Sequence, residues 1–252
     1  MINQISIPRM VHYIWFGRGE KTDLISTCIE NNKKILNDWQ FIEWNEDTYD
    51  INCCDYVKEA YEAKKYAFAS DYARFDILYK NGGVYLDTDV EMIKKFPNKF
   101  LEKEGFTGVE SNCKIAPGLV FACKAGNPIV LEILEDYRKD KFLLNDGSFN
   151  TETVVDRVTR VFQKYGFTLS GEKQEIEGFV VYPCEYFCAY DFVMSEFNIT
   201  ENTISIHHYT ATWVSLQSKL KKKVQKFIRL VFGRKIYLKL IQFKRKIWGE
   251  CK

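Results

Sequence analysis

One stretch of sequence constrains the fold of this chain most. It is a helical pattern followed by a glycine turn and a short strand that ends in two carboxylates. Residues 66–80 carry aromatic side chains four, three and four positions apart, the spacing of one helix face: Phe68, Tyr72, Phe75 and Tyr79. Gly82 and Gly83 follow, and glycine after a helix permits the left-handed turn that ends it. Residues 84–87 then have strand character, so helix, tight turn and strand predict a layered α/β fold.

The strand ends at Asp87 and Asp89, with one residue between them. Alternate side chains of a strand share a face, so the two carboxylates are expected to point the same way. Two like charges this close repel unless a positive charge lies between them. Open α/β sheets bind ligands beyond the C-terminal ends of their strands, which is where the two aspartates lie. Paired carboxylates suit Mg²⁺ or Mn²⁺. We therefore predict a divalent cation that holds a diphosphate.

Three other interpretations of this motif differ in strength. An EF-hand loop is excluded, because Met92 and Asn98 stand where glycine and glutamate are needed. A phosphatase of the haloacid dehalogenase type, with Asp87 as nucleophile, is disfavoured by Glu91. A pair of solvated turn acids is the plainest alternative, since aspartate is common in turns. Two aspartates one residue apart are a weak signal alone, so other residues must decide between these interpretations.

Strand and helix patterns alternate along the rest of the chain. Strands are expected at 10–16, 39–44, 105–110, 119–122, 179–182 and 203–209, and helices at 22–37, 55–65, 127–138 and 150–165. The hydrophobic fraction of 46% is enough for a real core. We expect no secretion signal and no spanning helix, because the chain has no apolar run of the required length. The eight cysteines form no CxxC pair, which favours free thiols in a reducing cytoplasm.

Other side chains are candidates for the same site. Asp71 and Arg74 are three positions apart and share a helix face, as ligand contacts or as an ordinary surface ion pair. His207 and His208 follow the last strand, and an imidazole can complete a metal shell begun by carboxylates. Trp213 is expected either to cover a bound sugar or to belong to the core.

Three segments together resemble a known family: IPRMVHYIWFG at 7–17, ASDYARFDILYKNGGVYLDTDV at 69–90 and HHYTATW at 207–213. Their order and spacing are similar to those of the family 32 DxD glycosyltransferases. That group includes mannosyltransferases, capsular polysaccharide transferases and the catalytic domains of clostridial glucosylating toxins. The resemblance implies a GT-A fold, a Rossmann-like α/β/α domain, over residues 1–215. It also implies transfer of a sugar from a nucleotide-sugar with retention of anomeric configuration.

The resemblance assigns roles to individual residues. Trp15 matches the tryptophan that stacks on the nucleotide base. Asp71 and Arg74 match residues that contact the ribose and the sugar. Asp87 and Asp89 match the metal and diphosphate site, and the leaving phosphate itself accepts the acceptor's proton in the family mechanism. A bound metal would act as a Lewis acid on the diphosphate, and Arg74 would add a fixed cation.

The resemblance is less complete toward the C-terminus. His208 falls where relatives place the last metal ligand, with His207 as the alternative. Trp213 falls where they place a tryptophan near the leaving diphosphate. Asn150 and Thr151 are guesses for sugar contacts.

The C-terminal segment 216–252 differs from the rest of the chain. It carries 13 Lys or Arg and one acidic residue, a net charge of +12, whereas the preceding residues carry −10. Its apolar residues fall at helical spacing, as in basic amphipathic helices that bind anionic membrane surfaces. We expect a membrane-associated tail, with a solvated basic helix as the alternative. Nucleic-acid binding is disfavoured because the acidic body breaks a continuous basic surface.

These observations predict a metal-dependent glycosyltransferase, cytoplasmic and peripheral on the inner face of the cell membrane. It would move a hexosyl or N-acetylhexosaminyl group, from a UDP-linked rather than a GDP-linked donor, with Mn²⁺ or Mg²⁺. The acceptor would be a glycan or lipid-linked molecule in surface polysaccharide or glycolipid synthesis. A non-catalytic nucleotide-sugar-binding protein is the main alternative from another class, and a toxin-like protein glucosyltransferase is a less favoured enzyme.

Overall fold

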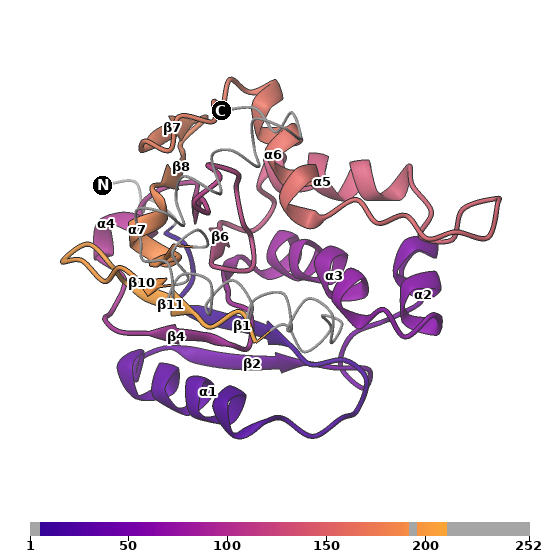
Figure 1. Cartoon of the computed structure of the whole chain (residues 1–252), viewed down its shortest axis with the longest axis horizontal. Coiled ribbons are helices and arrows are strands. Elements are labelled where there is room, and N and C mark those ends of the chain that lie inside the picture. Colours follow the sequence, from indigo (N-terminus) through magenta and orange to yellow (C-terminus); the bar gives the residue numbers. More distant parts are fainter. Residues whose placement is uncertain (1–5, 192–195, 211–252) are drawn as a thin grey trace, which may run out of the picture. The chain divides into compact units, whose positions relative to one another are not determined.

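A mixed seven-stranded sheet lies at the centre of the structure, a computed structural model that describes residues 6–191 and 196–210 (Figure 1). The strand order is β2-β1-β3-β6-β5-β8-β7. Their bounds are β1 (Met10–Ile14), β2 (Gln40–Trp44), β3 (Gly83–Tyr85), β5 (Gly105–Gly108), β6 (Phe121–Cys123), β7 (Gln174–Ile176) and β8 (Phe179–Tyr182). The α/β fold class expected from the sequence is confirmed, and the architecture is GT-A-like.

The sheet is parallel in part only. β1 pairs in parallel with β2 and β3, and β5 pairs in parallel with β8. β6 runs antiparallel to both of its neighbours, and β7 is antiparallel to β8. The chain passes from β5 to β6 without a helix, and a return without a crossover places a strand antiparallel to its neighbour.

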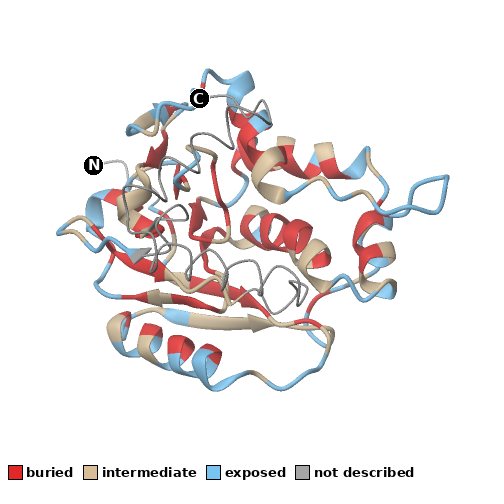
Figure 2. Cartoon of the chain, in the orientation of Figure 1, coloured by how far each residue is buried: buried red, intermediate tan, exposed pale blue. Residues whose placement is uncertain are grey.

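Helices pack on both faces of this sheet. Their bounds are α1 (Asp23–Ile35), α2 (Asp55–Glu62), α3 (Tyr66–Asn81), α4 (Asn98–Leu101), α5 (Pro128–Arg138), α6 (Val154–Lys164) and α7 (Cys184–Phe187). Strand side chains alternate between the two faces, so Tyr85 joins the core under α3 and α5 while Val84 joins the opposite core. Figure 2 shows the middle of α3 buried and α1 exposed along its outer side.

A small antiparallel pair of strands beside the main sheet determines where residues 205–207 lie. β4 (Val90–Met92) pairs with β11 (Ser205–His207), so Val90 lies opposite His207. Asn32 of α1, which is 5% exposed, fixes β4: its amide donates to the Val90 carbonyl over 2.8 Å and accepts from the Met92 N–H over 2.8 Å. A second short pair joins β9 (Tyr190–Asp191) and β10 (Glu196–Phe197).

Several expectations need correction at the ends of elements. The strand expected over 84–87 ends at Tyr85, so Asp87 and Asp89 lie in a turn between β3 and β4 rather than on one strand face. The Val90 N–H donates to the Asp87 carbonyl over 3.1 Å and closes this turn. The short elements β4, α4, β7, α7, β9 and β10 were not expected, because two to four residues show no period.

Some residues with a predicted role lie outside the part of the chain that the structure describes. Trp213 and the tail 216–252 fall there, so the division at 215 stays a prediction. Among the described helices, none combines the length and the apolar character that crossing a membrane requires.

The glycine turn after α3 is confirmed. Gly82 and Gly83 have φ of 66° and 97°, values that other residues rarely adopt. A Cβ on Gly83 would lie 2.8 Å from the Met10 carbonyl oxygen and 2.9 Å from the His12 imidazole Nε2. The turn therefore needs glycine both for its backbone angles and because β1 and His12 lie against it.

His12 links this turn to the sheet and is fully buried. Its Nε2 lies 2.9 Å from the Gly82 carbonyl oxygen, and the Trp44 indole N–H donates to its Nδ1 over 3.1 Å. Nδ1 accepts and Nε2 donates, so the ring is the neutral tautomer with its proton on Nε2. Burial lowers the pKa of His12 from 6.5 to about 4, against the opposing effect of the bond to Gly82.

Because His12 is buried and neutral, the free energy of unfolding depends on pH. Between pH 6.5 and 4 the unfolded chain binds a proton at this residue and the folded chain does not, so the free energy of unfolding falls as pH falls. The loss reaches about 3 kcal/mol near pH 4. Urea denaturation at stepped pH should show this slope in the native protein and a shallower one in His12→Gln. Equal slopes in both proteins would contradict the buried neutral state.

Candidate functional site

Two aspartates and a histidine converge where the β3–β4 turn meets β11. One ligand atom each from Asp87, Asp89 and His207 lie within 4.8 Å of one another. The pairing of Val90 with His207 brings these groups together, although more than a hundred residues separate them in the chain. The described chain thus holds an acidic cluster with one imidazole, at the C-terminal edge of the parallel strands β1 and β3.

The structure favours His207, not His208, as the cluster's imidazole. Its Nε2 lies 2.9 Å from an Asp89 carboxylate oxygen and 4.0 Å from one of Asp87. His208 is the ligand that the resemblance implied, but its Nε2 lies 2.8 Å from the Glu91 carboxylate. Successive side chains of an extended segment point to opposite sides, so only one of the two can face the aspartates.

The surroundings of His207 are strongly negative. Burial lowers its pKa, but Asp89, Asp87 and Glu110 raise it more, so the net shift is upward. Its Nδ1 is buried without a hydrogen-bond partner among the described residues. The acidic groups therefore outweigh the effect of burial, and a positive charge is favoured at this position.

Asp87 is oriented from three sides. The Tyr85 hydroxyl donates to one of its carboxylate oxygens over 2.9 Å, and Arg74 Nη1 lies 3.5 Å from the same oxygen. Its backbone N–H donates to the Gly118 carbonyl over 3.1 Å. A Cβ on Gly118 would lie 2.2 Å from the other carboxylate oxygen, so any larger residue would displace Asp87.

Arg74 and Asp71 form a buried ion pair, not the surface pair that sequence reasoning allowed. The Arg74 side chain is 4% exposed and donates to Asp71 over 2.6 Å. Its guanidinium also lies 4.7 Å from the centre of the Tyr85 ring. Burial raises the pKa of Asp71 to about 7, although Arg74 opposes the shift. The cation of Arg74 is thereby fixed between Asp71 and Asp87.

Trp15 leaves the same edge of the sheet, one residue beyond the end of β1. Its indole N–H donates to the Gly19 carbonyl over 2.7 Å, and Lys21 Nζ lies 5.5 Å from the ring centre. The ring is partly buried against Tyr13 and the α1 residues Ile25 and Ile29. Since β1 and β3 are parallel neighbours, Trp15 and Asp87 follow adjacent strand ends.

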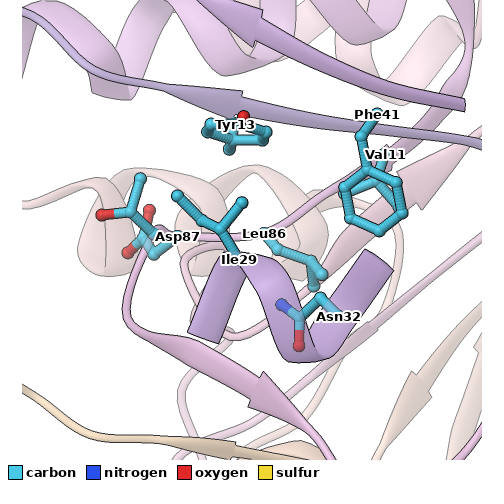
Figure 3. Close-up of a pocket in the computed structure, with 8 residues that line it drawn as sticks. Val11, Tyr13, Ile29, Asn32, Phe41, Leu86 and Asp87 are labelled. Carbon is cyan, nitrogen blue, oxygen red and sulfur yellow. The ribbon is translucent and has the colours of Figure 1, made fainter. Parts of the chain in front are cut away.

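Figure 3 shows a small cavity between β1, α1 and the segment that leads into the turn. Tyr13, Ile29, Asn32 and Leu86 line it, together with Asp87. Its volume of about 10 Å³ suits one water molecule and no sugar. This cavity is therefore packing space behind Asp87.

Asn150 and Thr151 do not join the cluster. Asn150 precedes α6, where its backbone N–H donates to the Phe142 carbonyl and its amide contacts Asp140. No contact joins Asn150 or Thr151 to the aspartates within the described residues, and Trp213 lies outside them.

Three further side chains near His207 were not predicted from the sequence: Glu110, Cys188 and Tyr209. The Tyr209 ring lies 4.0 Å from the His207 ring, and its hydroxyl donates to Glu110 over 3.2 Å and contacts the Cys188 thiol. Burial raises the pKa of Glu110, while Tyr209 and His207 oppose the shift. Glu110 follows β5 and carries no local motif, so no sequence signal could have connected it to the site.

With this geometry established, comparison with known proteins indicates what the site belongs to. Residues 21–107 match the family described as "Glycosyltransferase sugar-binding region containing DXD motif". This part of the chain resembles a sugar-transferase donor region. The match includes Asp71, Arg74, Asp87 and Asp89, and it ends before His207. It covers about a third of the chain, and no curated protein matches the sequence.

One of the two solved structures compared below agrees in fold. "PaToxG Glycosyltransferase" matches with a TM-score of 0.50 and 18% identity over 63% of this chain and 69% of that one. A "glycosyltransferase involved in the glycosylation of the major capsid of PBCV-1" matches with a TM-score of 0.45 and 12% identity, over 80% and 95%. At these identities the first likeness shows the fold, and family 32 in particular is not shown.

The contact between Gly118 and Asp87 predicts a selective variant. Gly118→Ala should weaken Mn²⁺ binding at least tenfold, which corresponds to ~1.4 kcal/mol, because the new methyl group displaces Asp87. Titration calorimetry would measure the affinity. Gly19→Ala is the matched control, because a Cβ there meets nothing within 4 Å. Equal affinities in the two variants would show that Asp87 does not bind the metal.

The two histidines can be separated by the same measurement. His207→Ala should lose most of the Mn²⁺ affinity, and His208→Ala should keep it, since only His207 faces both aspartates. The opposite result would restore His208 as the ligand.

Proposed function

We propose that this protein is a retaining glycosyltransferase that moves a sugar from a nucleotide-sugar to an acceptor hydroxyl with a divalent cation. The observation that supports this most is the Asp87–Asp89–His207 cluster, beside the fixed cation of Arg74, at the end of a segment that matches a DXD sugar-binding region. This combination distinguishes a built anion and metal site from a pair of solvated turn acids.

The residues of the cluster fit the metal that the fold implies. Two carboxylates and an imidazole suit Mn²⁺, and the carboxylates alone suit Mg²⁺. Gly118 leaves room at Asp87 that a Cβ would fill. When bound, the cation would supply Lewis-acid stabilisation of the diphosphate.

The chain's own groups supply binding and orientation. Arg74 is buried and cannot lose its proton, so it presents a permanent positive charge beside the leaving diphosphate. Asp71 holds the guanidinium in place, and removing either partner leaves an unpaired buried charge. Trp15 would stack on the base at the neighbouring strand end.

The finer identity of the reaction is part of the same proposal. A UDP-linked hexose or N-acetylhexosamine is the favoured donor, and a glycan or lipid-linked molecule of surface polysaccharide or glycolipid synthesis is the favoured acceptor. The basic residues of 216–252 would hold the enzyme on an anionic membrane surface where lipid-linked acceptors are presented.

Donor hydrolysis without an acceptor tests the proposal. Purified protein with Mn²⁺ should release free nucleotide slowly from one member of a panel of UDP- and GDP-sugars, and chelation should abolish the release. Asp87→Asn/Asp89→Asn should lower the rate at least a hundredfold, about 3 kcal/mol, because the charge that binds the cation is gone. High-performance liquid chromatography would follow the nucleotide.

Glu62→Gln/Glu135→Gln removes the same charge at exposed helical positions and should keep the native rate. Donor binding without turnover would instead favour a nucleotide-sugar-binding protein. Release of inorganic phosphate with phosphorylation of Asp87 would favour the phosphatase.

A further inference from the structure

A second cavity, of about 280 Å³, lies away from the aspartates. It is open to solvent on one side, and α4, the end of β8, α7 and the segment 201–204 line it. Four lysines line it: Lys94, Lys99, Lys103 and Lys173. Among the described residues of the lining, Glu201 alone is acidic.

Three of these lysines have no anionic partner among the described residues. Lys103 pairs with the Glu175 carboxylate over 2.9 Å, and Lys94 donates to the backbone carbonyl of Glu201. Lys99 and Lys173 are exposed and contact no carboxylate among the described residues. The cavity therefore has an excess of positive charge and attracts an anion.

Aromatic rings form its other wall. Phe100 and Tyr182 are stacked with centroids 4.3 Å apart, and Tyr186 lies 4.9 Å from Tyr182. Tyr182 is 4% exposed and lines the cavity, yet its hydroxyl has no hydrogen-bond partner in the described part of the chain. This hydroxyl is not one of the buried polar atoms that lack a partner, so it is open to the cavity and can donate to a ligand there. Phe100 and Lys173 lie against the Tyr182 ring, so the partly buried Tyr186 ring, the hydroxyls and the ammonium groups form the surface that a sugar with an acidic group would contact.

The cavity lies within reach of the aspartates along one strand. Ile204 lines it, and His207 follows three residues later in the same extended segment. At the rise of a strand this separation is about 10 Å. A short oligosaccharide can span that distance.

We propose that this cavity binds a carboxylate-bearing sugar of the acceptor glycan, several sugar units from the hydroxyl that reacts at the Asp87 cluster. That the ligand is an acceptor rests on the proposed function, whereas binding of an acidic saccharide does not. The cavity would select acidic over neutral glycans, because Lys99 and Lys173 are free to pair with the carboxylate.

Hydrogen exchange of the full-length protein tests this with site resolution, which matters because the basic tail also attracts anions. The probes are trigalacturonate, neutral maltotriose and inorganic phosphate at millimolar concentrations. Trigalacturonate should protect amides of α4 and α7, and the other two should not. Lys99→Glu/Lys173→Glu should need at least tenfold more ligand for the same protection, and Tyr182→Phe should need several-fold more.

Lys58→Glu/Lys141→Glu makes the same charge change at exposed positions outside the cavity lining and should behave as the native protein. No protection, equal loss in both lysine pairs, or equal protection by maltotriose or phosphate would each overturn the proposal. Donor hydrolysis should be unchanged in Lys99→Glu/Lys173→Glu. If the native protein hydrolyses no donor but the saccharide still binds, the acidic-sugar site stands and the transferase proposal fails.

Discussion

The site depends on how the repulsion between Asp87 and Asp89 is balanced. Two carboxylates in one short turn are stable only if neighbouring groups offset their charge. Arg74 does so from α3, with its own burial offset by Asp71, and His207 does so from β11. Asp89, Asp87 and Glu110 raise the pKa of the partly buried His207, so the surroundings remain negative. This excess of negative charge supports the proposed cation site.

The surrounding fold serves to hold this balance in place. Gly82 and Gly83 let α3 turn sharply into β3, and the neutral His12 joins that turn to the first two strands. Arg74 and Asp87 therefore lie on consecutive elements with a short, rigid connection. Asn32 fixes β4 on the other side of the turn, and β4 in turn positions His207. A helix, a turn and two strand pairings together bring Asp87, Asp89 and His207 to one place.

Local sequence patterns were enough to predict much of this arrangement. The aromatic period predicted α3, the paired glycines predicted its end, and the apolar run after them predicted β3. The residue types Asp-Thr-Asp at a strand end indicated a metal and phosphate site. Period could not show that β6 runs antiparallel or that β3 ends before Asp87, because two or three residues carry no period and strand order is a long-range property.

The sequence by itself determined the class of fold, the glycine turn and the two aspartates, since each depends on interactions between residues close in the chain. Only the tertiary structure decided that His207 rather than His208 faces them, that Asp71 and Arg74 are buried together, and that Gly118, Glu110 and Tyr209 border the site. The same holds for the lysine-lined cavity, whose residues come from four separate segments. These features depend on which segments pair across the chain, and that is set by packing of the whole core and not by any local pattern.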